Sequence, residues 1–247
     1  AGACALSLKG EQILAAHAGK PAEAMRLLPA GKHVLEVAGT PEEVTVRAIP
    51  ALFYNVYPST PQIQPFGSNT WERLRKHTLP NMNMIESQVI DTPEYQEWVS
   101  QGKLWIANIQ APGLVDKDEW TPEKMLEIWR KPRDWDLAKI GGIQVDEYYP
   151  GLSPKMVLDT ALSAARMVEE PAFAGKLWIP FVVNMFGNDL SELFMRICLG
   201  AGWPFSVEVY EGEMPTEREN LAGIRSRFRT VAEGWESAYP GSLRRAI

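Results

Sequence analysis

The fold is decided by the stretch Ile140-Gly141-Gly142-Ile143-Gln144-Val145-Asp146-Glu147-Tyr148-Tyr149-Pro150-Gly151. It reads as a short apolar strand that ends in two adjacent carboxylates, followed by aromatic residues and a Pro-Gly turn. In a barrel of parallel strands, catalytic residues are placed at the carboxyl ends of the strands. The stretch therefore predicts an enzyme site at a strand end, although it does not specify the substrate.

From about residue 51 onward, apolar strands alternate with helical segments, a pattern typical of parallel strands joined by covering helices. The predicted strands span residues 52–57, 82–87, 104–110, 140–147, 177–184 and 205–210. The predicted helices span residues 71–79, 93–101, 122–129, 154–169, 189–199 and 217–238. Three helices begin at Thr-Pro or Ser-Pro, where the hydroxyl can cap the helix and proline takes its first position.

Six strands are fewer than the eight of a closed barrel. We therefore expect an α/β fold in which residues 51–247 form a (β/α) TIM-type barrel that is incomplete or part of a longer protein. An open doubly wound sheet is the alternative. No Gly-rich dinucleotide fingerprint follows the first strand and no phosphate loop is present in the sequence, which disfavours the nucleotide-binding forms of that alternative.

Residues 1–50 predict a small β-rich, sandwich-like segment. Candidate strands span residues 5–8, 24–28, 33–37 and 44–47, and several alternate in period two. Residues 10–19 could instead form a helix because residues 11–16 have good helix propensity, but strands are preferred. Residues 28–37 resemble a hairpin arm of small β-sandwich modules attached to secreted bacterial proteins. We accordingly expect an extracellular or periplasmic location.

Composition restricts the function classes. Of 247 residues, 45% are apolar and 23% charged, which is ordinary for a globular protein, and no apolar run is long enough to span a bilayer. A net charge of −6 without a cluster of Lys and Arg argues against a nucleic-acid partner. Nine Trp residues are a high count; such rings can stack on neutral sugars, although they are also good core material.

Polar groups end nearly every predicted strand, and parallel strands deliver their ends to the same rim. The set comprises Tyr54, Tyr57, Glu86, Gln110, Asp146, Glu147, Asn184, Glu208 and Glu211. Carboxylates, amides and aromatic rings suit glycosidic bond cleavage, in which one carboxylic acid protonates the departing oxygen. A second carboxylate then attacks the sugar carbon or activates water.

Metal and serine-nucleophile chemistry fit this set less well. His17, His33 and His77 are scattered and none stands at a predicted strand end, although an all-oxygen Mg or Ca site stays open. No Gly-x-Ser-x-Gly elbow is present. Cys4 and Cys198 are too few for a thiolate metal cluster or a disulfide framework. We expect no metal and no cofactor, and a carbohydrate as the partner.

The stretch from Gly142 to Gly151 resembles fourth-strand segments of TIM-barrel glycoside hydrolases, including the chitinase-like family, whose strand ends in spaced acids followed by Tyr-Pro-Gly. Aligning the Tyr-Pro-Gly ends places Gln144, Asp146 and Tyr148 where that family has two aspartates and its catalytic glutamate. Asp146 thus matches one family acid, whereas Tyr148 stands in place of the proton donor. The resemblance implies a barrel glycosidase with acids after the fourth strand and late in the barrel.

Alternation along the strand ranks the acids. If Gln144 points into the barrel, Asp146 and Tyr148 do so too, and Glu147 points toward the helices unless the strand bulges or ends there. Asp146 is therefore the first catalytic candidate and Glu147 the second. Glu208 is the partner candidate, because a carboxylate within an apolar strand is costly to bury unless it is paired or functional.

The sequence thus predicts a glycoside hydrolase acting on a poly- or oligosaccharide, with Asp146 or Glu147 and Glu208 as acid and nucleophile or base. The substrate-binding candidates are Tyr54, Tyr57, Glu86, Gln110, Tyr148, Asn184 and Glu211. Two alternatives stay open. One is a noncatalytic carbohydrate-binding barrel, which Tyr148 favours, and the other is a structural module of a larger secreted protein.

Overall fold

The computed structural model describes residues 3–17, 19–20, 22–49, 51–58, 70–111, 120–149, 151–209 and 215–247. The chain divides into two compact units. The first comprises Ala1–Leu52 and Thr70–Asn83, and the second comprises Phe53–Asn69 and Met84–Ile247. No helix in the described part of the chain is long and apolar enough to cross a membrane.

The first unit contains a three-stranded antiparallel sheet of order β2-β1-β3. Its strands are β1 (Cys4–Leu8), β2 (Glu11–Ala16) and β3 (Leu35–Gly39). Lys9 and Gly10 join β1 to β2, and both have positive φ, 53° and 79°, as the tight turns of β-hairpins require. The helix considered for residues 10–19 is therefore wrong. Residues 24–28 and 44–47 also form no strand.

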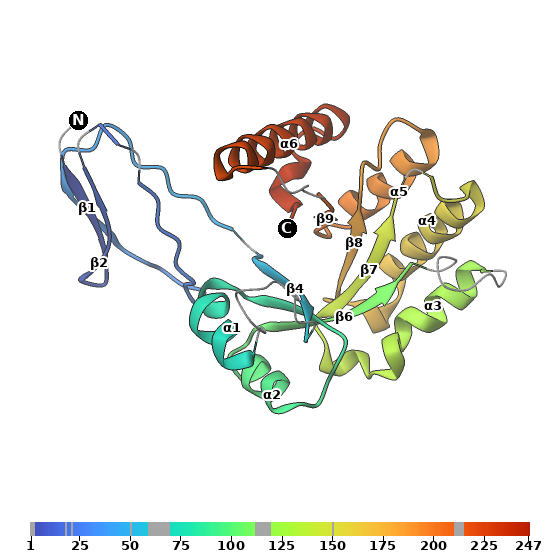
Figure 1. Ribbon diagram of the computed structural model, residues 1–247. Helices are drawn as coiled ribbons and strands as arrows, with labels where there is room; N and C mark the ends of the chain where they lie inside the picture. Colours follow the sequence, from blue (N-terminus) through green and yellow to red (C-terminus); the bar gives the residue numbers. More distant parts are fainter. Residues whose placement is uncertain are drawn as a thin grey trace. The chain divides into compact units, whose positions relative to one another are not determined.

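The second unit is built on a curled sheet of six parallel strands, a half-barrel (Figure 1). The strands are β4 (Phe53–Tyr57), β5 (Met84–Ser87), β6 (Leu104–Gln110), β7 (Gly142–Tyr148), β8 (Leu177–Val182) and β9 (Ser206–Val207). They lie side by side in the order in which they occur in the sequence. A doubly wound sheet would reverse its strand order at a switch point. The predicted α/β fold with a partial barrel is therefore confirmed.

Helices follow most strands, and their starts are set by local chemistry. The α-helices are α1 (Trp71–His77), α2 (Pro93–Ser100), α3 (Pro122–Arg130), α4 (Pro154–Glu169), α5 (Asp189–Gly200) and α6 (Glu217–Ala238). Short 3-10 turns are η1 (Leu79–Asn81), η2 (Pro132–Asp134), η3 (Leu137–Lys139), η4 (Pro171–Phe173) and η5 (Ser242–Arg245). Thr92, Thr121 and Ser153 each cap a helix that begins with proline, as predicted, by accepting a hydrogen bond from a backbone N–H three residues on.

Aromatic packing defines the face of the sheet that the helices cover, which we call the outer face. Trp178 on β8 contacts Trp129 of α3 and Phe194 of α5, with ring centroids 5.0 and 5.6 Å apart. Trp105 on β6 contacts Tyr95 of α2 at 5.5 Å. Because side chains alternate along a strand, residues one position before or after these tryptophans point to the opposite, inner face.

The edge of the sheet beyond β9 is extended by a short parallel pairing. The N–H of Phe205 donates to the carbonyl of Arg245 at 3.1 Å, and the N–H of Ile247 donates to the carbonyl of Phe205 at 2.9 Å. Trp235 of α6 packs against Phe205, with ring centroids 4.6 Å apart. The end of α6 is therefore held on the outer face beside this edge.

Gly142 provides a test of the sheet register. A Cβ at this position would lie 2.2 Å from the carbonyl oxygen of Leu177 on the adjacent strand. We expect Gly142→Ala to lower the free energy of unfolding by about 1–3 kcal/mol in urea denaturation, the usual cost of overpacking.

The matched control is Gly223→Ala on α6, where a Cβ would meet nothing within 4 Å. This change should raise the free energy of unfolding by about 0.5–1 kcal/mol, because alanine favours a helix over glycine. A Gly142→Ala protein as stable as the unmodified chain would contradict the pairing of β7 with β8.

Candidate functional site

Amides and a carboxyl group form two adjacent rungs on the inner face of β6 and β7. The register pairs Asn108 with Gln144 and Gln110 with Asp146. Ile143, the residue before Gln144, pairs with the outer-face Trp178, so Gln144 and its register partners point inward. Side chains on paired strands stand about 5 Å apart. The four polar side chains therefore lie close together on this face, where Asn108 and Gln144 are buried and Gln110 is exposed.

Glu86 extends this polar surface onto β5. It pairs with Ile106, two residues before Asn108, and its side chain is completely buried. On β4, Phe53 pairs with Met84, which points to the same face as Glu86. Asn55 stands two residues after Phe53 and therefore shares that face. The Asn55 Oδ1 atom is buried and has no hydrogen-bond partner among the described residues.

A bulge in β7 separates Asp146 from Tyr148. Val145 pairs with Pro180 and Tyr148 with Val182, so that three steps along β7 oppose two along β8. Glu147 occupies the bulge with a φ of 68°, which is uncommon for a residue other than glycine. The bulge reverses the alternation beyond Asp146.

Tyr148 consequently lies in the aromatic core of the outer face. Its ring is 5.0 Å from that of Phe194 and 6.3 Å from that of Trp178, and burial raises the pKa of its hydroxyl. The expectation that Tyr148 shares the inward orientation of Gln144 and Asp146 is therefore wrong, because the bulge inserts one extra residue. In this structure Tyr148 is a core residue rather than part of a substrate surface.

The two tyrosines of β4 also project to the outer face. Tyr57 pairs with Ser87 and contacts the Trp105 ring edge-on at 5.8 Å. Tyr54 pairs with Ile85, which itself pairs with Trp105. Tyr57 therefore stands at the end of β4, as predicted, but both tyrosines point away from the inner face.

The carboxyl group of Asp146 at the inner face has a strongly raised pKa. The pKa of this carboxyl is raised from 3.8 to about 6. Burial is the largest cause, followed by the negative charges of Glu147 and Glu208. All three carboxyl groups are half-buried. Glu208, the predicted partner, and Glu147, the alternative acid, thus both lie close enough to Asp146 to act on its ionisation.

Glu208 is the first residue after β9 and continues its pairing with β8. Its N–H donates to the carbonyl of Val182 at 2.8 Å, and Ser206 pairs with Phe181. Val145 and its register partner Pro180 point to the outer face, so the next residue, Phe181, points to the inner face. Ser206, which pairs with Phe181, therefore points inward, and so does Glu208, two residues later. Asp146 and Glu208 therefore share one face of the half-barrel.

The other predicted residues are distributed more widely. Gln110 is exposed and neighbours Asp146, whereas Asn184 is exposed two residues beyond the end of β8. Glu211 lies outside the described residues. No group of three or more His, Cys, Asp or Glu side chains in the described part of the chain is arranged to hold a metal ion.

Gln144 is the inner-face residue whose burial most needs an explanation. It is fully buried, and neither its amide nitrogen nor its amide oxygen has a hydrogen-bond partner among the described residues. An unsatisfied buried amide costs free energy of folding. Such a group is satisfied when water or a bound molecule supplies the missing donor and acceptor.

Reading only strand ends misses three inner-face amides: Asn55, Asn108 and Gln144. A signal for two of them is present in the sequence. Asn108 and Gln144 stand two residues before Gln110 and Asp146, and a strand returns to the same face every second residue. Alternation already relates Gln144 to Asp146, and extending it backward from Gln110 would have identified Asn108 in the same way.

In comparisons with known proteins, no family model, curated protein or solved structure matches the chain significantly.

The environment of Asp146 can be tested without an activity assay. Its carboxyl has a pKa of about 6 in the folded protein, against an ordinary 3.8. Between these two pH values the folded state therefore keeps a proton that the unfolded state has already lost. Stability conferred by this proton is present at pH 4 and lost as the pH rises to 6. One pKa unit corresponds to about 1.4 kcal/mol, which is reduced here for solvent screening. The free energy of unfolding of Asp146→Asn should therefore exceed that of the unmodified protein by about 1–2 kcal/mol at pH 7 and by almost nothing at pH 4.

Urea denaturation across this pH range measures the difference. The control is Asp134→Asn on η2, whose carboxyl is 92% exposed and pairs with the exposed Lys131 at 3.5 Å. Because exposed pairs are weak, this change should alter the free energy of unfolding by less than about 0.5 kcal/mol at either pH. An Asp146→Asn gain that is the same at both pH values would contradict the raised pKa.

Replacing Gln144 tests whether its amide is unsatisfied. We expect Gln144→Met to raise the free energy of unfolding by about 1–2 kcal/mol, because the buried polar atoms are removed at nearly constant volume. Gln110→Met, at the exposed amide of the next rung, should change it by less than about 0.5 kcal/mol. Destabilisation by Gln144→Met in urea denaturation would show that the amide has a partner.

Proposed function

We propose that the protein hydrolyses glycosidic bonds in a poly- or oligosaccharide, with Asp146 as the proton donor and Glu208 as the partner carboxylate. The observation that carries this proposal is the placement of Asp146 and Glu208 on the same face of the half-barrel. There, burial and the charges of Glu147 and Glu208 raise the pKa of Asp146 to about 6. An extracellular or periplasmic location and a role in carbohydrate metabolism belong to the same proposal.

The chemistry requires two carboxyl groups in different protonation states. A carboxyl group with a pKa near 6 keeps a large share of its protons close to neutral pH and can act as a general acid. Asp146 would protonate the departing oxygen while Glu208 attacks the sugar carbon or activates water. A carboxyl separation of about 5–5.5 Å would give retention of configuration, and about 6.5–9.5 Å would give inversion.

Glu147 supports this division by its charge. Its negative charge is the second cause of the raised pKa of Asp146, after burial. Held in the bulge, Glu147 would keep the neighbouring carboxyl protonated without contacting the sugar. We therefore assign it a positioning role in place of the acid role considered from the sequence.

The amides of Asn108, Gln110 and Gln144 supply the binding part of the proposal. Each amide offers both a donor and an acceptor, which matches the hydroxyl groups of a sugar. Gln144 in particular has both functions unoccupied among the described residues. The exposed Gln110 would hydrogen-bond sugar hydroxyls directly beside Asp146, and the buried Asn108 and Gln144 would reach them through bridging water.

Noncatalytic carbohydrate binding is the second candidate. It is favoured by the position of Tyr148, which stands where the resembling family has its proton donor and is buried in the outer core. On this alternative, the inner-face amides bind a sugar that Asp146 and Glu208 do not cleave.

Hydrolysis of a panel of neutral oligo- and polysaccharides tests the proposal. Asp146→Asn and Glu208→Gln should each lower kcat by about 10²–10⁴-fold, the usual contribution of acid–base groups. For the unmodified protein, kcat/KM should fall about tenfold per pH unit above pH 6, because the proton donor of Asp146 is lost there.

Asp134→Asn serves again as the exposed-carboxylate control and should retain full activity. Unchanged turnover in both Asp146→Asn and Glu208→Gln would remove the assigned roles. Binding of a glycan without turnover by the unmodified protein would support the noncatalytic alternative.

A further inference from the structure

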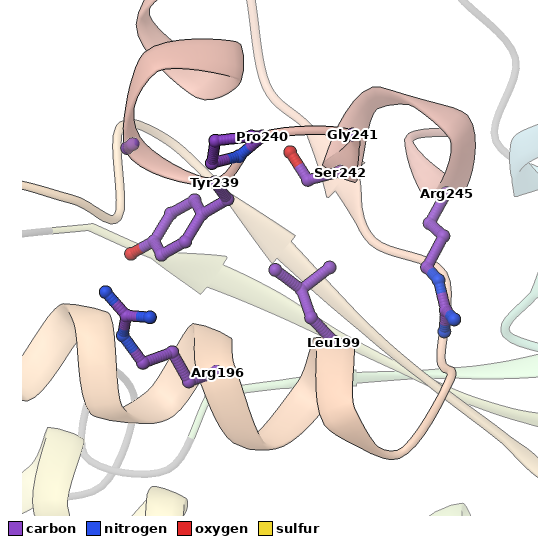
Figure 2. A pocket seen from close by; sticks show the side chains of 8 residues that line it. Arg196, Leu199, Tyr239, Pro240, Gly241, Ser242 and Arg245 are labelled. Carbon is purple, nitrogen blue, oxygen red and sulfur yellow. The ribbon is translucent and has the colours of Figure 1, made fainter.

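We propose that a second site, between α5 and the turn that joins α6 to η5, binds a small organic dianion with an apolar body. This inference is independent of the proposed hydrolase function. A cavity of about 320 Å³ lies there, lined among others by Arg196, Leu199, Tyr239, Ser242 and Arg245 (Figure 2). That volume is at the lower end of the range for small-molecule sites.

The middle of the cavity is apolar and firmly held. Leu199 of α5 projects into it between the two arginines, and Tyr239 forms a wall near Arg196 (Figure 2). The Tyr239 hydroxyl donates to the carbonyl of Met185 at 2.6 Å. Burial raises the pKa of Tyr239 to about 12, so the hydroxyl keeps the proton with which it makes this hydrogen bond.

The two ends of the cavity carry positive charge. Arg245 forms no ion pair with any residue that the structure describes, and its guanidinium lies 3.0 Å from where a Cβ at Gly202 would be. The ion pair of Arg196 is with Glu192, at 3.4 Å on the same helix and with both side chains exposed to solvent. Exposed pairs of this kind are weak, so both guanidinium groups can accept an anionic partner.

Nearby acids do not cancel these charges. Besides Glu192, Glu236 lies beside the turn, and its Oε1 accepts a hydrogen bond of 2.8 Å from the N–H of Gly241. Glu236 thereby stabilises the turn that forms the upper border of the cavity. One oxygen of its carboxylate is thus held by the backbone, and among the described residues Glu236 forms no ion pair with Arg196 or Arg245.

A buried hydroxyl provides an independent indication of a ligand. Ser242 is only 5% exposed, and its Oγ atom has no hydrogen-bond partner among the described residues. Buried polar groups are normally satisfied, and this one borders the cavity. A ligand oxygen in the cavity would supply the missing partner.

These features together specify the ligand class. Guanidinium groups bind carboxylates and phosphates through paired, charge-assisted hydrogen bonds. Arg196 and Arg245 stand on opposite sides of Leu199 (Figure 2), so a single small anion would engage one of them. An acidic group at each end of an apolar chain would engage both and would cover Leu199.

Calorimetric titration with straight-chain dicarboxylates from succinate to azelate tests the site. We expect binding that strengthens as the chain becomes long enough to span both arginines, and octanoate, with one carboxylate, should bind about tenfold more weakly than the best dicarboxylate. Arg196→Gln and Arg245→Gln should each reduce dicarboxylate affinity to the octanoate level. Ser242→Ala should reduce it about twofold to fivefold.

Arg244→Gln, at an exposed arginine outside the cavity, is the control and should leave affinity unchanged. Arg245→Lys keeps the charge but loses the paired geometry, and it should give an intermediate loss in a variant that preserves the fold. Absence of dicarboxylate binding, equal binding of octanoate, or unchanged affinity in both glutamine variants would overturn the proposal.

Discussion

The packing of Trp178 against α3 and α5 is the interaction on which the rest of the half-barrel depends. Its ring contacts Trp129, Phe194 and Tyr148, and through them it attaches β7 and β8 to their helices. Once this face is fixed, strand alternation assigns every second residue of β7 to the other face. The arrangement of Gln144 and Asp146 is thus a consequence of where the large aromatic residues are buried.

The bulge at Glu147 lets Asp146 point to the inner face while Tyr148 packs in the aromatic core of the outer face. A regular strand would turn Tyr148 inward beside Asp146 and leave a gap among Trp178 and Phe194. With one extra residue, the tyrosine completes the aromatic core and Asp146 keeps its inner position. The backbone strain of a positive φ at Glu147 is offset by the apolar area that Tyr148 buries.

The sequence predicts those features that depend on near neighbours. Ser-Pro and Thr-Pro mark the starts of α2, α3 and α4, because a cap and a proline act within one turn. Helix propensity is misleading at residues 11–16. These residues form β2, because the turn at Lys9 and Gly10 brings them back to pair with β1. At the site, Asp146 and Glu208 were predicted together. The outward positions of Tyr57 and Tyr148 were not, because register shifts in β4 and β7 leave no mark in residue type.

The sequential strand order has a consequence for how the sheet assembles. Within the described residues, neighbouring strands of the six-stranded sheet are consecutive in the chain, so each of these pairings closes a loop no longer than one strand–helix–strand repeat. Pairings of short sequence separation lower the entropic barrier to folding and raise folding rates. The half-barrel can therefore grow by successive addition during synthesis, with β4 and β5 joined before the acids of β7 and β9 have left the ribosome.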